Sequence, residues 1–110
     1  MDNKPISLAP RPPAFMGNDC YATYVAGDDM IPRLYRRNKC FVDPSKPIFN
    51  GSLVLVRFIE NEKEVAYFRE FVSQDKDSIQ LKQYNPETTE TFKTNEICSI
   101  HPINAVSYIT

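Results

Sequence analysis

Short runs of β-branched and aromatic residues, separated by turn-forming residues, occupy the chain from residue 20 onward. Such runs are typical of strands, and Gly, Pro, Asn and Asp are typical of the turns between them. The pattern predicts strands over residues 20–25, 39–42, 52–58, 64–72, 79–83, 91–92, 96–100 and 105–109. Polar tips at residues 61–63 and 74–77 indicate two antiparallel hairpins in series.

The segment 29–35 is the only helical candidate. Met30 and Leu34 are four residues apart, which places them on one face of a helical turn. Asp28 or Asp29 is a suitable cap, and Pro32 falls in the first turn, where proline is tolerated. The predicted fold class is therefore mostly β, built from antiparallel hairpins with one short helical turn.

The first 18 residues differ from the rest because they contain Pro5, Pro10, Pro12 and Pro13. Proline has no amide donor and favours extended backbone in the residue before it. We therefore expect residues 1–18 to form an extended, proline-rich arm or linker. Residues 19–110 are expected to form one domain, since 110 residues with 42% hydrophobic side chains suit a single core.

The charge balance excludes some partners. Thirteen basic and fourteen acidic side chains give a net charge of -1, so the chain lacks the overall positive field that holds nucleic acid or anionic membranes. The longest aliphatic run, residues 53–56, is far shorter than the roughly 20 residues of a membrane span. No basic start followed by an apolar stretch opens the chain, so no signal peptide is expected.

Groups that commonly carry chemistry are scarce. Cys20, Cys40 and Cys98 are odd in number and far apart, which is typical of reduced, buried thiols in a cytoplasmic protein. The single histidine, His101, is interpreted as structural. With no Cys/His cluster and no Gly-rich phosphate loop, we expect neither a metal site nor a cofactor.

Two groups of charged residues need an explanation. Arg33, Arg36, Arg37 and Lys39 are interpreted as a solvated face rather than a nucleic-acid patch, because stacking aromatics do not alternate with them. Arg69 is different, since the period of two in a strand places it on an otherwise apolar face. A charge in such a face is costly, so Arg69 must reach water or an acidic partner.

Several segments, in this order, resemble the C-terminal domain of LexA-like and phage CI-type repressors, the self-cleaving Ser-Lys domains of the S24 peptidase family. They are residues 21–33, 41–44, 64–72, 81–86 and 100–101. The likeness extends over residues 19–107 and implies that family's fold. The proline-rich arm is also similar to the linker that follows a helix-turn-helix domain in such repressors.

The resemblance also implies a reaction. In the family, a serine in a Gly-Asp-Ser-Met turn attacks an Ala-Gly or Cys-Gly bond of the linker, and a neutral lysine accepts its proton. Here the turn reads Gly27-Asp28-Asp29-Met30, so Asp29 stands at the serine position. Residues 1–19 also contain no Ala-Gly or Cys-Gly dipeptide.

Two alignments remain open for the lysine. One places Phe68 at the lysine, where it fills the space with apolar bulk, and the other places Arg69 there. Neither side chain can accept a proton at ordinary pH, so no catalytic residue is expected. In the second alignment Asp29 and Arg69 meet as an ion pair. The alternative is that Asp29 caps the turn and Arg69 reaches solvent.

The resemblance therefore implies a catalytically inactive dimerisation or regulatory domain of a LexA-like or prophage (SOS-type) transcriptional repressor. Its partner would be a second copy or a full-length repressor, and DNA would be bound only through a separate helix-turn-helix domain. Val106, Tyr108 and Ile109 are candidate dimer contacts, with completion of the core as the alternative. The chain is either a piece of a longer regulator or free-standing.

Two other functions are considered. One is an accessory subunit of an error-prone DNA polymerase, a branch of the same fold that normally keeps the serine and lysine. The other is an active self-cleaving peptidase domain, which here would have to use Asp29.

Overall fold

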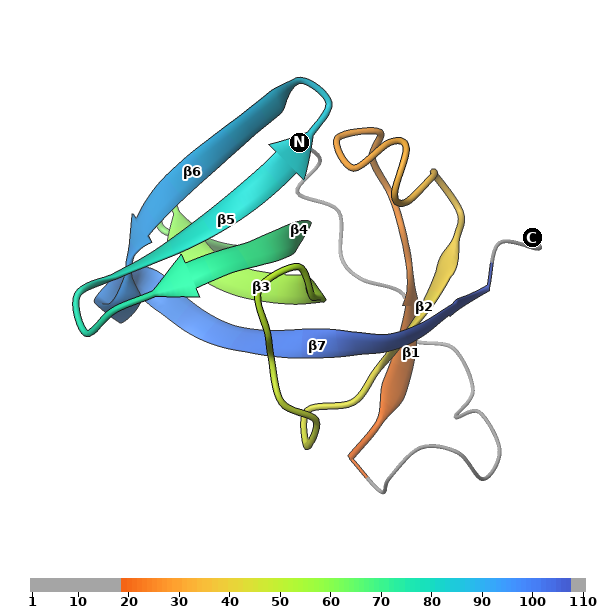
Figure 1. Ribbon diagram of the computed structural model, residues 1–110, viewed down its shortest axis with the longest axis horizontal. Coiled ribbons are helices and arrows are strands. Elements are labelled where there is room, and N and C mark those ends of the chain that lie inside the picture. The colour runs from red at the N-terminus through yellow and green to blue at the C-terminus, as the bar shows by residue number, and fades with distance from the viewer. Residues whose placement is uncertain (1–18, 108–110) are drawn as a thin grey trace.

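The computed structural model describes residues 19–107, which form a seven-stranded antiparallel sheet of order β1-β2-β7-β3-β4-β5-β6 (Figure 1). Its elements are β1 (Tyr21–Tyr24), β2 (Lys39–Val42), β3 (Leu53–Glu60), β4 (Lys63–Gln74), β5 (Ser78–Tyr84), β6 (Glu87–Lys93), the 3-10 turn η1 (Thr94–Glu96) and β7 (Ile97–Ser107). The mostly β fold class is confirmed. The predicted arm, residues 1–18, lies outside the described residues, as do Tyr108 and Ile109.

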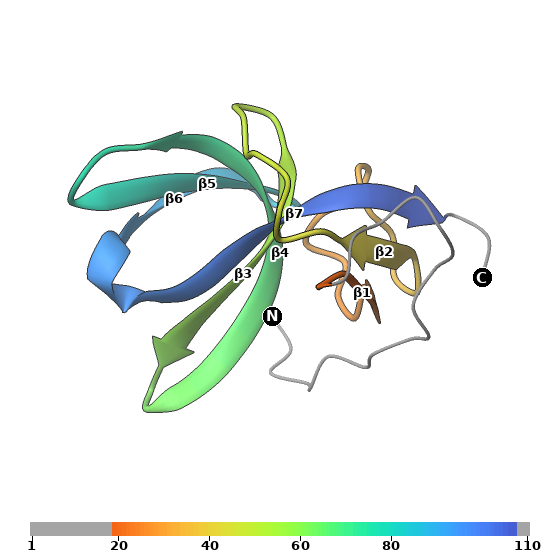
Figure 2. The same cartoon turned by 90° about the horizontal axis from the view of Figure 1, so that it is seen from below.

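The long strand β7 joins two parts of the sheet. Its first half pairs with β3 as far as Pro102, and from Ile103 onward it pairs with β2. Figure 2 shows β1 and β2 near one end of β7 and the hairpins of β3–β6 curling away near the other. The prediction of two strands separated near residues 101–104 is wrong. Pro102 is tolerated because its missing N–H falls where the neighbouring strand changes, and its carbonyl still accepts the Asp43 N–H at 3.2 Å.

The two predicted hairpins in series are confirmed as β3–β4 and β4–β5. Asn61 and Glu62 form the tip of the first, and both have positive φ (52° and 65°), as a two-residue turn that matches the strand twist requires. Strand β6 is longer than predicted because Tyr84 pairs with Glu87 across the Asn85-Pro86 turn, which extends the ladder over a polar sequence.

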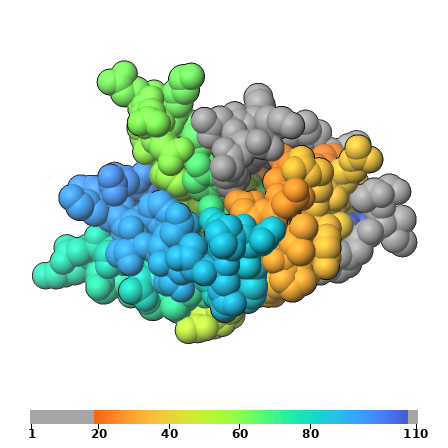
Figure 3. Space-filling model, turned by 90° about the horizontal axis from the view of Figure 1, so that it is seen from above, coloured from red at the N-terminus to blue at the C-terminus, as the bar shows by residue number. Residues whose placement is uncertain are grey.

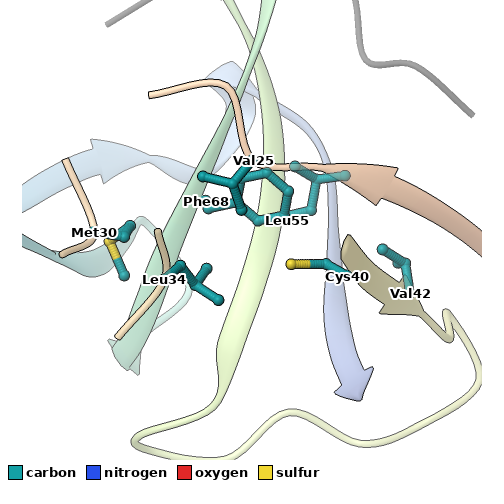
Figure 4. Packing of buried hydrophobic residues seen from close by; sticks show 7 residues of the cluster. All are labelled: Val25, Met30, Leu34, Cys40, Val42, Leu55 and Phe68. Carbon is teal, nitrogen blue, oxygen red and sulfur yellow. The ribbon is translucent and has the colours of Figure 1, made fainter. Parts of the chain in front are cut away.

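Both faces of β3 are buried, which explains its continuous apolar sequence. Leu55 packs with one cluster of buried side chains, and Val54 and Val56 pack with the other. The first cluster comprises Val25, Met30, Leu34, Cys40, Val42, Leu55 and Phe68 (Figure 4). The second comprises Val54, Val56, Phe58, Val65, Tyr67, Ile79 and Leu81.

The segment 29–35 forms hydrogen-bonded turns and no helix, so the predicted place of the helical turn is wrong. The Met30 carbonyl accepts from the N–H groups of Arg33 (2.8 Å) and Leu34 (3.0 Å). The chain then turns back, and Arg37 N–H donates to the Val25 carbonyl at 2.8 Å. This return to the end of β1 leaves no room for a second helical turn.

The prediction for the cysteines has a mixed outcome. Cys20 and Cys40 are buried free thiols, as expected, whereas Cys98 is exposed, contrary to the prediction. Within residues 19–107, none of the helical segments is long and apolar enough to cross a membrane.

Candidate functional site

The turn that carries Asp29 is fastened to the turn between β5 and β6. The Asp29 carbonyl accepts from the N–H groups of Tyr84 (3.1 Å) and Asn85 (2.9 Å). The Asn85 side chain also donates to the Asp28 carbonyl at 3.0 Å. In the space-filling view the segment around residue 30 (orange) lies directly against the β5–β6 turn (cyan), in agreement with these bonds (Figure 3).

Arg69 lies at the centre of the site and is only 3% exposed. Its Nη1 is 2.7 Å from Oδ2 of Asp29, and its Nε is 3.1 Å from Oε1 of Glu90. Nη1 also donates to the Phe68 carbonyl at 2.8 Å, and the guanidinium carbon lies 4.7 Å from the centre of the Tyr67 ring. The ion pair expected from the second alignment is confirmed, and the alternative that Arg69 reaches solvent is wrong.

The side chain of Phe68 lies on the opposite face of β4 from Arg69. It is buried in the first core cluster with Met30 and Leu34 (Figure 4). The apolar packing expected of Phe68 is therefore present together with the ion pair of Arg69. A phenyl ring has no exchangeable proton, and a guanidinium stays protonated in proteins. Neither side chain can act as a general base.

The other residues of the turn have separate roles. A Cβ on Gly27 would lie 2.9 Å from Oδ1 of Asp29, so the glycine leaves space for that carboxylate. Asp28 points away and accepts two hydrogen bonds from Arg36, at 3.2 and 3.0 Å. These bonds lower the pKa of Asp28. Met30 is fully buried in the core, and Asp29 is the residue of the turn whose side chain pairs with Arg69.

A cavity of about 320 Å³ opens beside the ion pair. Its walls come from β3, β4, β6 and the β5–β6 turn, together with Asp29. The lining residues are Asp29, Phe58, Glu60, Tyr67, Arg69, Gln83, Asn85, Pro86, Glu90 and Phe92. His101 does not line this cavity. Burial and nearby Arg57 lower the pKa of His101, and its Nδ1 lies 3.3 Å from the Tyr21 hydroxyl.

A second network ties the same segment to β4. Arg33 forms an ion pair with Glu70 and donates to the Gly51 carbonyl at 3.1 Å. Tyr84 donates to the same Glu70 carboxylate, and this bond raises the pKa of Tyr84. The interpretation of Arg33, Arg36, Arg37 and Lys39 as a solvated face fits Arg36 and Arg37, which are exposed. The side chain of Arg33 is 37% exposed but is also held in this network.

Sequence reasoning missed several residues of the site. Glu90 was overlooked because the run of Thr and Glu in residues 87–91 resembles a loop. The place of Glu90 beside β5 follows from the pairing of Tyr84 with Glu87 across the turn, which the polar sequence itself does not show. Glu60 and Tyr67, joined by a hydrogen bond of 2.9 Å, meet only because the β3–β4 register brings them together.

Of the dimer candidates, only Val106 is described. It lies opposite Cys40 in the β2–β7 ladder and packs against the first core cluster, half-buried. That environment fits the alternative in which Val106 completes the core. Among the described strands, β2 alone pairs with β7 beyond Pro102.

Comparison with known proteins gives the following. The Peptidase S24-like family matches residues 6–104. Repressor protein C of Rhizobium phage 16-3 is 32% identical over 90 residues, which cover 77% of this chain and 34% of that protein. The chain thus spans about a third of the length of this relative. No solved structure matches the chain. The family resemblance predicted from the motifs is confirmed: the chain belongs to the Peptidase S24-like family.

Proposed function

We propose that the chain is the regulatory domain of a phage-type repressor that does not cleave itself and acts through association. Its partner is a second copy of the domain or a full-length repressor, and a separate helix-turn-helix domain binds the DNA. Family membership and the similarity to Repressor protein C support the repressor assignment. The observation that carries the loss of cleavage is the ion pair between Asp29 and Arg69.

The chemistry of that pair argues against self-cleavage. Amide hydrolysis of this type needs an activated nucleophile and a base that accepts its proton. Asp29 offers a carboxylate whose charge is already held by Arg69 at 2.7 Å. The ring of Phe68 offers no proton acceptor, and a guanidinium does not act as a base in proteins.

Intact-mass spectrometry tests the loss of cleavage. Alkaline pH favours the neutral lysine on which the family's reaction depends, so the purified chain is incubated there and its mass followed. We expect the full mass of 12.7 kDa to persist. Discrete fragments that form in the wild type and not in Asp29→Asn would contradict the proposal, whereas fragments common to both identify a contaminating protease.

Light scattering tests the association. We expect a particle of twice the chain mass, held through the side of β7 that faces away from β2. Lys at the exposed residue Asn104 places a charge on this segment and should shift the particle toward the monomer. Asn95→Lys, at an exposed residue of the 3-10 turn η1, is the matched control. A strict monomer at high concentration would overturn the association.

A further inference from the structure

The cavity beside Asp29 combines aromatic walls with polar groups that converge on one space. Its volume of about 320 Å³ lies in the range of small-ligand sites. The ring centre of Phe58 lies 5.0 Å from that of Tyr67 and 4.9 Å from that of Phe92, so these three rings form a continuous apolar wall. Such a wall suits the hydrocarbon stem of a ligand whose end is polar.

The charges in the lining do not balance. Asp29, Glu60 and Glu90 contribute three carboxylates, and Arg69 contributes one guanidinium, which leaves two negative charges in excess. Arg69 is shared between Asp29 and Glu90. The carboxylate of Glu60 accepts a hydrogen bond from the Tyr67 hydroxyl at 2.9 Å. It forms no ion pair with any residue in the described range 19–107.

The Tyr67 hydroxyl reports the same negative field. Burial, followed by the hydrogen bond and charge of Glu60, raises the pKa of Tyr67 to about 12. The charge of Glu90 acts in the same direction, and the positive charge of Arg69 only partly opposes it. Tyr67 therefore stays a neutral donor that orients the Glu60 carboxylate.

We propose that this cavity binds the guanidinium or alkylammonium group of an arginine or lysine side chain from a bound polypeptide. The stem lies along the rings of Phe58, Tyr67 and Phe92, and the cation meets the carboxylates of Glu60 and Glu90. The inference rests on the proposed function in one respect, because Asp29 serves here as part of a binding wall and not as a nucleophile.

Nuclear magnetic resonance with small probes tests the site. Acetyl-argininamide is titrated into the full chain, with acetyl-citrullinamide as the uncharged probe of the same shape. We expect saturable shifts of the Gln83, Asn85 and Phe92 amides with the arginine probe alone. Glu60→Gln removes one charge from an exposed residue and should weaken binding roughly tenfold, since a hydrogen bond between two charged groups becomes one to a neutral acceptor. Glu62→Gln, at the exposed tip of the same hairpin, should bind as the wild type does.

Equal binding of both probes, or no difference between Glu60→Gln and Glu62→Gln, would overturn the proposal. A second arm uses propylguanidinium, which has the cation and stem but no peptide groups. Weaker binding of propylguanidinium than of acetyl-argininamide supports a polypeptide ligand. Equal binding of the two probes would overturn the polypeptide part of the proposal and assign the cavity to small free cations. These outcomes are independent of self-cleavage and of the scattering mass, so a failure here is distinct from a failure of the proposed function.

Discussion

Two neighbouring aspartates of one turn each hold an arginine, yet the two ion pairs lie in different surroundings. Asp28 and Arg36 meet at 3.0 Å with about half of each side chain exposed. Asp29 and Arg69 meet at 2.7 Å, with Arg69 3% and Asp29 18% exposed. The outer pair has two hydrogen bonds and the inner pair one, so the inner pair differs by its burial and not by a richer contact.

Burial decides what each pair does for the fold. Exposed pairs contribute little because water and salt screen their attraction. A buried pair gains little overall from its formation, but loss of one partner strands the other charge in the protein. The inner pair also contacts Glu90 and the Phe68 carbonyl, so it joins the turn to β4 and β6. Among the contacts of the described residues, the outer pair joins Asp28 to Arg36, which also donates to the Ala26 carbonyl at 2.7 Å.

The largest effect is expected from Arg69→Met. The change strands the Asp29 carboxylate beside a buried apolar side chain, and we expect a loss of about 3–5 kcal/mol in the free energy of unfolding. Urea unfolding followed by circular dichroism measures it. Arg36→Met is the matched control and should unfold close to the wild type. Equal losses of unfolding free energy in the two variants would mean that burial does not distinguish the two ion pairs.

The double variant Asp29→Ala/Arg69→Met should be more stable than Arg69→Met alone. The double variant has no stranded Asp29 carboxylate. Glu90 also loses an ionic partner, but its side chain is 38% exposed and can be hydrated. The same urea experiment gives the comparison. A double variant that is as unstable as the sum of the two single variants would show that Asp29 and Arg69 are not coupled.

A smaller effect is expected from Gly27→Ala. The added methyl group would lie 2.9 Å from Oδ1 of Asp29 and must displace a carboxylate that Arg69 holds. The unfolding midpoint should fall by less than in Arg69→Met. In an Asp29→Ala background the same change should have no effect, because the displaced group is absent. A persistent loss there would mean that the glycine is needed for another reason.

The smallest effect is expected for the ion pair between Asp28 and Arg36, and it concerns the stability of the fold at acid pH. Arg36 lowers the pKa of Asp28 in the folded protein, so the pair stabilises the fold above the unfolded pKa of about 3.9 and ceases to do so as the pH falls through the folded pKa. A small stability difference between the wild type and Arg36→Gln should therefore be present at neutral pH and vanish in strong acid. A difference that grows as the pH falls would contradict this sign.

Local pattern predicted most of the sheet, since β1–β5 follow from runs of apolar residues bounded by turns. It failed where the partner strand decides the outcome. Pro102 does not break β7 because its missing donor falls between two partners, and β6 is a strand because Tyr84 pairs with Glu87. Neither fact is visible in the residues alone.

The site was predictable only in part for the same reason. The isolated charge of Arg69 on an apolar strand face required an acidic partner, and the family motif pointed to Asp29. Glu90 and Glu60 enter the site through strand register, which no local pattern fixes. The excess of negative charge in the cavity could therefore be recognised only from the structure.

The pairing of Arg69 with Asp29 can be measured directly by ¹⁵N resonance of the arginine side chains at rising pH. The buried Nη1 group of Arg69, which donates to Asp29, should exchange slowly and remain visible at alkaline pH, and its resonance should move in Asp29→Asn but not in Asp28→Asn. An Arg69 signal that exchanges as fast as that of exposed Arg37, or that ignores Asp29→Asn, would mean that the cleft does not hold the ion pair.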